Sequence, residues 1–239
     1  MLFASDVDNT LIRSYKYAKP GDICVEIKNG AQQSFMTPDA IPLLKEISEK
    51  CTFVPVTTRS LEQYLRINFG VTPKYAIVAN GAMLLIDGKP DEQWIREIRE
   101  TLRAELPNIA ENELIYDIRQ INECFISAKS NEPEQAVAYL QTQINADEYT
   151  VCSIRSKVYV FPIGINKGTA IDMLKTRIKP QKTICAGDSE LDIPMLTKAD
   201  IAIIPSTLNY HAQNALILNS ESFPRDTLLT VRELLYSCA

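Results

Sequence analysis

The feature that most constrains the fold is a short apolar run at the start of the chain, residues 2–4, which stops at Asp6 and Asp8. Such a run, ending in polar loop residues, is typical of a buried strand followed by a turn. Because side chains alternate along extended chain, both carboxylates are expected on one side. They repel each other unless a cation or a shared proton offsets their charge. The pattern indicates metal-assisted phosphoryl transfer, with an Asp-rich turn after an edge strand as the alternative.

Further apolar runs repeat this form along the chain and alternate with helical patterns. They lie at residues 51–56, 75–79, 182–186 and 201–204, with a possible short last strand at 215–218. Strands that alternate with helices predict an α/β fold with a parallel sheet. In such a sheet, ligands bind at the carboxyl ends of the strands. The residues that follow each run are therefore the first candidates for a site.

A polar segment after the first strand contains a hairpin signal. Asn29-Gly30 separates the strand-like runs 23–28 and 31–36, and this dipeptide is typical of a tight hairpin turn. We expect a β-hairpin flap near the carboxyl end of the first strand. The segment 37–39, Thr-Pro-Asp, predicts the start of a helix with proline in its first turn.

The pattern changes between residues 83 and 161. A short strand and an Asp87-Gly88 turn come first, followed by a helix, two strands, a helix and two strands. This order predicts an antiparallel sheet with helices on one side. We therefore expect a core formed by residues 1–82 and 162–239, with a small α+β unit of residues 83–161 inserted into it.

Composition excludes several classes of partner. The net charge of −5 and the pI of about 5.1 argue against a nucleic-acid surface, which usually needs a basic patch. No apolar run reaches the length of a membrane span, and the N-terminus does not resemble a secretory signal. The six cysteines form no C-x-x-C pair, so free thiols in a reducing cytoplasm are expected.

Polar residues at the other strand and helix ends are candidates for an anion site. Thr57, Thr58 and Arg59 follow the second buried strand, and Lys167 precedes a helix. Asp188 and Asp192 follow the run at 182–186. Hydroxyls and an arginine at a strand-to-helix turn suit an anion. Each residue also has an ordinary alternative, since Ser and Thr cap helices, lysines are often solvated, and Asp192 could serve a helix N-terminus.

Taken in this order, the motifs resemble those of the haloacid dehalogenase-like phosphohydrolase superfamily. Residues 6–10 match its D-x-D-x-T motif, Thr57 its second motif, Lys167 its third, and residues 187–192 its G-D-x-x-x-D motif. The resemblance implies a Rossmann-like core, with residues 83–161 as the smaller form of the family's larger cap. The segments around Asp6 and Thr57 look most similar to the sucrose-phosphatase-like group of sugar-phosphate phosphatases. The sequence departs at Thr58 and Leu191, where many relatives have glycine and asparagine.

The resemblance also implies roles for the motif residues. Asp6 would be the nucleophile that forms an aspartyl-phosphate, and Asp8 the general acid and base. Mg²⁺ would be held by Asp6, the backbone carbonyl of Asp8 and Asp188, with Asp192 one step further out. Lys167 would neutralise the phosphoryl oxygens, and Thr57, Thr58 and Arg59 would bind the phosphate.

The cap offers candidates for the rest of the substrate. Four cations of this segment are candidates, Arg119, Lys129, Arg155 and Lys157, which either meet the polar end of the substrate or lie solvated on the sheet. His211, the sole histidine, is expected to be a surface or packing residue.

The function expected from these observations is a Mg²⁺-dependent phosphatase of a small phosphorylated metabolite, such as a sugar phosphate. A sugar phosphomutase, a receiver-like module phosphorylated on Asp6, and a catalytically silent sensor are the alternatives. The cap and the second carboxylate, Asp8, argue against the receiver, which has no leaving group to protonate. We expect no nucleic-acid or membrane partner, and a monomer or small homo-oligomer.

Overall fold

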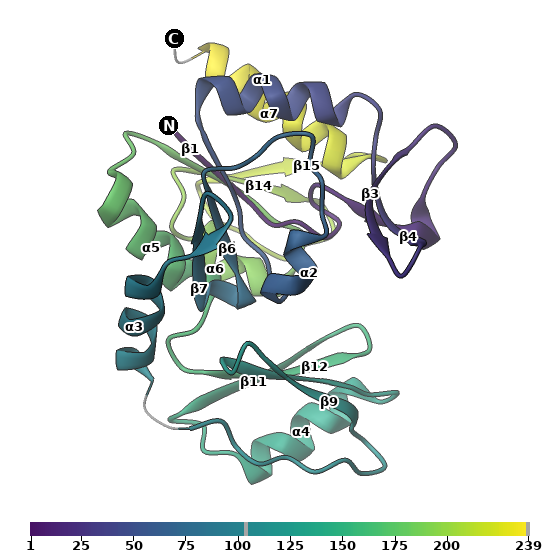
Figure 1. Ribbon diagram of the computed structural model, residues 1–239, viewed down its shortest axis with the longest axis vertical. Helices are drawn as coiled ribbons and strands as arrows, with labels where there is room; N and C mark the ends of the chain where they lie inside the picture. Colours follow the sequence, from purple (N-terminus) through teal and green to yellow (C-terminus); the bar gives the residue numbers. More distant parts are fainter. Residues whose placement is uncertain (103–104, 238–239) are drawn as a thin grey trace.

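The computed structural model describes residues 1–102 and 105–237, and its centre is a five-stranded parallel sheet (Figure 1). The strand order is β15-β14-β13-β1-β5. The strands are β1 (Leu2–Ser5), β5 (Thr52–Pro55), β13 (Thr183–Ala186), β14 (Ile201–Pro205) and β15 (Ala215–Leu218). In the register, Phe3 of β1 lies between Ile184 of β13 and Phe53 of β5. The predicted α/β fold is thus confirmed, and β1 has a strand on each side.

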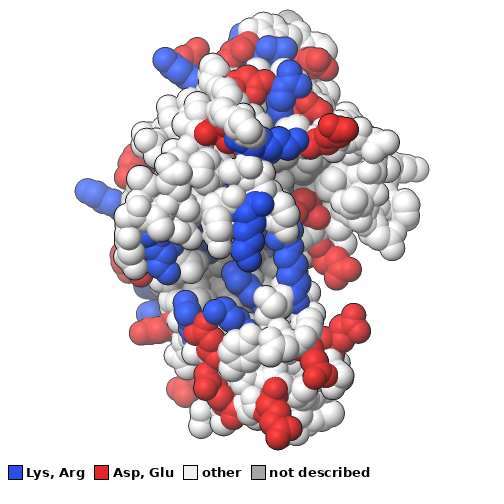
Figure 2. All heavy atoms as spheres, turned by 90° about the vertical axis from the view of Figure 1, so that its right-hand side faces the viewer, with Lys and Arg blue, Asp and Glu red and all other residues white. Residues whose placement is uncertain are grey.

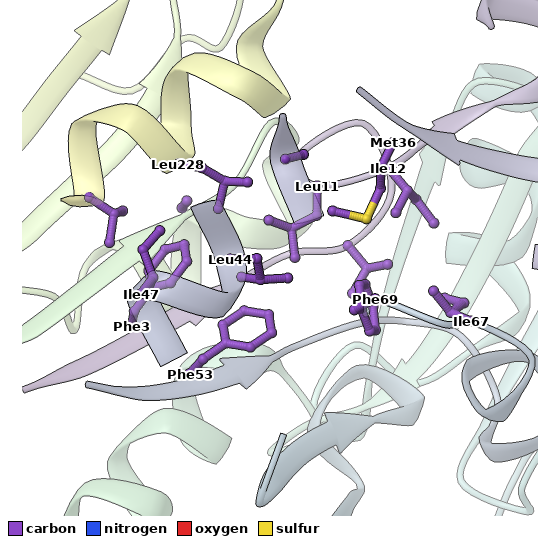
Figure 3. Close-up of a cluster of buried hydrophobic side chains, with 14 of the residues drawn as sticks. Phe3, Leu11, Ile12, Met36, Leu44, Ile47, Phe53, Ile67, Phe69 and Leu228 are labelled. Atoms are coloured by element: carbon purple, nitrogen blue, oxygen red, sulfur yellow. The ribbon is translucent and has the colours of Figure 1, made fainter. Parts of the chain in front are cut away.

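Helices cover both faces of this sheet, which explains why its strands are apolar throughout. One face packs against α1 (Ala40–Lys50) and α7 (Phe223–Ser237), and the other against α5 (Lys167–Ile178) and α6 (Ile193–Leu196). On the first face, Phe3 and Phe53 stack beneath Leu44 and Leu228 (Figure 3). We refer to the parallel sheet with these four helices as the core.

The predicted flap is present as a small antiparallel sheet in the order β2-β4-β3. It comprises β2 (Arg13–Ser14), η1 (Tyr15–Tyr17), β3 (Ile23–Lys28) and β4 (Ala31–Met36). Asn29 and Gly30 adopt positive φ angles of 51° and 77°, as this type of hairpin turn requires. The predicted helix start was two residues early. Pro38 lies in a turn closed by a hydrogen bond from Ala40 N to Thr37 O, and the helix begins after it.

The chain leaves the core through a third sheet and a helix. These are α2 (Leu61–Leu65), β6 (Tyr75–Val78), η2 (Ala79–Gly81), β7 (Met83–Ile86), β8 (Lys89–Pro90) and α3 (Glu92–Thr101). β7 pairs with β6, which a parallel bridge joins to the core next to β5. On α3, Trp94 donates its indole N–H to the Gly81 carbonyl at 3.0 Å, and Arg177 of α5 pairs with Asp91 and Glu97.

The contacts of β7 and α3 with the core concern the boundaries of the insertion predicted at residues 83–161. The sequence analysis assigned the strand and the first helix after residue 83 to the insert, whereas the structure packs both, β7 and α3, against the core. The physical reason is the buried Trp94, which is in contact with the apolar cluster of the core. The boundaries 83 and 161 therefore remain a prediction, and we propose that the inserted unit begins after α3.

The remaining inserted residues form a separate layer below the core in Figure 1, which we call the cap. It is an antiparallel sheet in the order β11-β12-β10-β9, covered on one face by α4. Its elements are β9 (Tyr116–Ile121), β10 (Phe125–Lys129), α4 (Pro133–Gln143), β11 (Tyr149–Ile154) and β12 (Lys157–Pro162). Because side chains alternate, Val158 and Val160 pack against α4. Lys157 and Tyr159 line the side that faces the core.

Two further expectations concern the chain as a whole. Within residues 1–102 and 105–237, no helix has the length and hydrophobicity needed to span a bilayer. The structure shows Cys24, Cys51, Cys124, Cys152 and Cys185 as free thiols, while Cys238 lies outside the described residues. None of those five cysteines forms a disulfide.

Candidate active site

The two aspartates at the end of β1 line the same cavity but differ in exposure. The strand is held in register beyond its last residue by hydrogen bonds from Asp6 N to Ala186 O and from Val56 N to Ser5 O. The turn that follows includes Asn9 at a φ of 61°, a conformation that asparagine tolerates well. Asp6 is buried, whereas the side chain of Asp8 is 48% exposed. Both carboxylates thus line one cavity, with Asp6 the more deeply buried of the two.

Lys167 bridges two carboxylates at the centre of the site. It begins α5, whose N-cap Asn166 accepts a hydrogen bond from Thr169 N. Its Nζ lies 2.5 Å from Asp6 Oδ1 and 2.6 Å from Asp192 Oδ1, and the residue is 1% exposed. Burial opposes the charge, but the carboxylates of Asp192 and Asp6 outweigh it and raise the pKa of Lys167. The lysine is thus held in place as a cation.

The loop after β13 places the other two aspartates. Asp192 is fully buried, and its Oδ2 accepts hydrogen bonds from Asp188 N, Ser189 N and Ser189 Oγ at 2.8 to 3.1 Å. A Cβ atom at Gly187 would overlap the Asp192 side chain, which explains why glycine is needed there. Asp188 accepts a hydrogen bond from Thr10 at 3.3 Å. Protein donors therefore occupy both oxygens of Asp192 and leave Asp188 more available.

Three of these carboxylates form a group that could hold a metal ion. One oxygen from each of Asp6, Asp188 and Asp192 lies within 4.8 Å of the others. Burial raises the pKa of Asp6 and that of Asp188, the latter to about 6, and the charge of Asp192 raises both further. Among the described residues, Lys167 is the one cation paired with the group, so these carboxylates lack a full counter-charge. Oxygen ligands with surplus negative charge fit a hard divalent cation.

The turn after β5 supplies the residues of the second motif. Thr57 is buried, its N–H donates to Ile77 O, and its hydroxyl accepts a hydrogen bond from Arg59 N at 3.1 Å. The loop of η2 supports this turn, because Asn80 N donates to Thr57 O. Thr58 and Arg59 line the adjacent cavity, whereas the buried Thr57 is not among its lining residues.

Arg59 has a contact that the sequence analysis did not anticipate. Its guanidinium binds both oxygens of Asp8 at 2.8 and 2.9 Å and Glu26 at 2.8 Å. Burial opposes ionisation of Asp8, but the hydrogen bonds and charge of Arg59 hold the pKa of that carboxyl below its usual value. Asp8 is therefore paired with Arg59, and its carboxylate does not belong to the group formed by the other three aspartates.

Glu26 is a buried residue that the sequence analysis missed. It lies on β3 of the flap, is 4% exposed, and accepts hydrogen bonds from Ser34 at 2.6 Å and from Arg66 at 3.2 Å. Burial opposes its charge, yet the hydrogen bonds from Ser34, Arg59 and Arg66 lower the pKa of Glu26. A carboxylate inside an apolar strand-like run was the available signal, since such a residue is rarely buried without a partner.

The site opens into a cavity of about 710 Å³ between the core and the cap. The core contributes Asp6, Asp8, Thr58, Arg59, Lys167 and Asp188 to its lining. The cap contributes all four of the cations noted in its sequence: Arg119, Lys129, Arg155 and Lys157. Figure 2 shows lysine and arginine side chains gathered between the upper and lower parts of the molecule. His211 is exposed and does not line this cavity.

Comparison with known proteins places this geometry in context. A family model described as haloacid dehalogenase-like hydrolase matches residues 75–204, which is 130 of the 239 residues. The matched stretch includes Lys167, Asp188 and Asp192, while Asp6 and Asp8 precede it. No curated protein sequence matches the chain.

Several solved structures share the fold at low sequence identity. A sucrose-phosphatase from Synechocystis sp. PCC6803, in complex with sucrose and phosphate, has a TM-score of 0.65 and 16% identity, covering 97% of this chain and 98% of that one. A haloalkanoate-superfamily phosphatase from Bacteroides thetaiotaomicron has a TM-score of 0.62 and 17% identity, with 97% and 94% covered. Trehalose-6-phosphate phosphatase from Aspergillus fumigatus has a TM-score of 0.54 and 14% identity, with 98% and 92% covered.

Proposed function

This chain belongs to the haloacid dehalogenase-like hydrolase family, and we propose that it is a Mg²⁺-dependent phosphatase of a small phosphorylated metabolite. The observation that carries the proposal is the buried arrangement of Lys167 between Asp6 and Asp192, with Asp188 beside them. This arrangement combines a carboxylate nucleophile, a fixed cation and oxygen ligands for a metal. Phosphoryl transfer depends mainly on positioning and on neutralising charge, which these groups supply.

Asp6 is the nucleophile in this proposal. One of its oxygens attacks the phosphorus, the bond from phosphorus to the ester oxygen breaks, and the leaving oxygen takes a proton from the Asp8 carboxyl. A water molecule then attacks the aspartyl-phosphate and gives a proton to Asp8. Inorganic phosphate leaves and the Asp6 carboxylate is restored. Asp8 has to leave Arg59 for these steps, since the arginine occupies both of its oxygens in the structure.

Asp6 and Asp188 would hold the metal, together with the backbone carbonyl of Asp8. When bound, Mg²⁺ would neutralise part of the charge that gathers on the carboxylates and the phosphoryl oxygens. Asp192 would position Lys167 and the Asp188 loop, because protein donors already occupy both of its oxygens. Lys167 and the hydroxyl of Thr57 would bind phosphoryl oxygens, and Thr58 and Arg59 would line the path to them.

A sugar phosphate is the substrate class that the neighbours favour. The sucrose-phosphatase and the trehalose-6-phosphate phosphatase act on phosphorylated sugars by name, and both are similar to this chain over more than 90% of its length. The cap cavity of about 710 Å³ has room for a ligand of this size. The sugar phosphomutase remains the runner-up, and it differs in returning the phosphoryl group to the sugar.

The experiment is phosphate release from a panel of sugar phosphates and other metabolite phosphates, with Mg²⁺ and with chelator. Asp6→Asn should abolish release, and Asp172→Asn, an exposed aspartate paired with Lys198, should leave it unchanged. Isomerisation of a sugar phosphate without net release would indicate the mutase. A folded protein that binds Mg²⁺ but neither releases phosphate nor isomerises any compound would overturn the proposal.

A further inference from the structure

We infer that the substrate carries a second anionic group, a carboxylate or a second phosphate, which binds the cap wall of the cavity at Arg155 and Lys157. The inference rests on the proposed phosphatase function, since it concerns the other end of the same substrate. It goes further because nothing in that function requires the part of the substrate beyond the transferred phosphoryl group to be charged.

The first observation is a surplus of positive charge on the cap wall. Arg119, Lys129, Arg155 and Lys157 line the cavity against a single cap carboxylate, Asp117. Asp117 is already shared, since it pairs with Arg119 at 2.8 Å and with Lys129 at 2.7 Å. Within the described part of the chain, Arg155 and Lys157 have no carboxylate within ion-pair distance. The cap wall is therefore positively charged in a chain whose net charge is −5.

The second observation is the strand register, which sets like charges against each other. Lys129 of β10 and Lys157 of β12 are directly paired residues of antiparallel strands. Like charges in this position destabilise a sheet. Burial lowers the pKa of Lys157, and the charges of Arg59, Lys129 and Arg119 lower it further, against the opposing effect of Asp8. An anion bound between these cations would offset their repulsion.

The third observation is the backbone at the tip of the turn from β11 to β12. Arg155 adopts a φ of 53°, a left-handed conformation that glycine or asparagine adopts more easily. An arginine at such a position costs stability without an evident packing gain, since its side chain is exposed in the cavity wall. The two-residue turn between β11 and β12 accounts for the positive φ, so the informative feature is an arginine where glycine or asparagine would fit with less strain.

The cap cations also lie apart from the groups that would bind the transferred phosphoryl. In the proposed function, the transferred phosphoryl group binds Lys167, Asp6 and the turn at Thr57, all of which belong to the core. The cap wall is formed by β9, β10, β12 and the turn before β12, on the other side of the cavity. A neutral sugar could accept hydrogen bonds from these cations, but only an anion would also offset their charge.

The test compares phosphate esters that differ in one anionic group. We would measure kcat/KM for glucose 6-phosphate against 6-phosphogluconate, and for fructose 6-phosphate against fructose 1,6-bisphosphate. The compounds with a second anion should be preferred about tenfold or more, as expected for one charge-assisted hydrogen bond. Lys157→Ala should remove most of that preference by raising KM for them, with KM for the singly charged esters nearly unchanged. Equal rates, or equal losses on both kinds of ester, would overturn the inference.

Two variants separate binding from folding. Arg155→Gly relieves the left-handed backbone, so it should leave the melting temperature unchanged or higher while it weakens binding of the second anion. Lys198→Ala removes an exposed lysine outside the cavity and serves as the control. If no compound is hydrolysed, calorimetric titration of Asp6→Asn with 6-phosphogluconate and glucose 6-phosphate still decides the question. Tighter binding of 6-phosphogluconate supports the inference although the phosphatase proposal fails, and equal binding overturns it.

Discussion

Arg59 binds both carboxylate oxygens of Asp8, with Nε 2.8 Å from Oδ2 and Nη2 2.9 Å from Oδ1. The same guanidinium binds Glu26 of the flap at 2.8 Å. A bidentate pair of this kind is strong and geometrically specific. Glu26 thus holds Arg59 in place, and Arg59 in turn holds Asp8, the proposed general acid and base. The flap, through Glu26 and Arg59, thus influences where the Asp8 carboxylate lies.

Glu26→Gln should weaken both the fold and the activity. The buried carboxylate accepts hydrogen bonds from Ser34, Arg59 and Arg66, so the variant leaves two arginines less well paired. We expect a loss of about 1–3 kcal/mol in the free energy of unfolding, measured with urea. We also expect kcat to fall several-fold, because Arg59 without the Glu26 charge pairs more strongly with Asp8, which has to leave the arginine for proton transfer. Glu62→Gln, which removes an exposed partner of Arg66, should change neither quantity appreciably.

The contribution of Glu26 should depend on pH. Its pKa is lower in the folded protein than in the unfolded chain, because the hydrogen bonds from Ser34, Arg59 and Arg66 outweigh burial. The stabilisation is therefore complete above the unfolded pKa of about 4.3 and is lost as the pH falls through the folded pKa. The difference in unfolding free energy between the wild type and Glu26→Gln should shrink as the pH falls from 6 to 3. A difference that stays constant over this range would contradict the prediction.

Asp188→Asn and Asp192→Asn should differ in their effect on metal binding. Asp188 has the more available oxygens, so its variant should lose nearly all affinity for Mg²⁺ in a calorimetric titration. Asp192 is saturated by Lys167 and by donors of residues 188 and 189, so its variant should retain weakened binding, by about 10–100-fold. It should also lower the melting temperature, because Lys167 loses a buried partner. Equal loss of Mg²⁺ affinity in both would show that Asp192 is a direct ligand.

Gly187→Ala should disrupt the site through a steric overlap. The new methyl group would meet the Asp192 side chain, which packs directly against this glycine. We expect a large loss of kcat and of Mg²⁺ affinity, with the displaced Asp192 no longer holding Lys167. Gly88→Ala is the matched control, since it adds a methyl in open space at a φ of 78° in the β7–β8 turn. That control should lower stability by about 1 kcal/mol through backbone strain and leave kcat unchanged.

Local patterns predicted much of the fold. The Asn29-Gly30 turn and the Asp87-Gly88 turn depend on residues that tolerate positive φ, and both occur where predicted. The apolar strands of the core were predictable because strands buried on both faces have few polar residues. The helix α3 was harder to assign, since its apolar stripe shows that one face is buried but not which surface covers it. Trp94 packs against the core, a partner that periodicity does not specify.

The sequence by itself determined which residues follow each strand, and therefore which carboxylates and cations gather where the carboxyl ends of parallel strands meet. Asp6 and Asp188 could be assigned to one edge of the sheet for this reason, and Lys167 joined them through its resemblance to a family motif. Only the tertiary structure decided how their neighbours pair. Asp8 turns to Arg59, and Lys157 faces Lys129, because side-chain direction and strand register depend on packing across long sequence separations. Periodicity describes one strand or helix at a time, whereas these contacts join three separate parts of the chain.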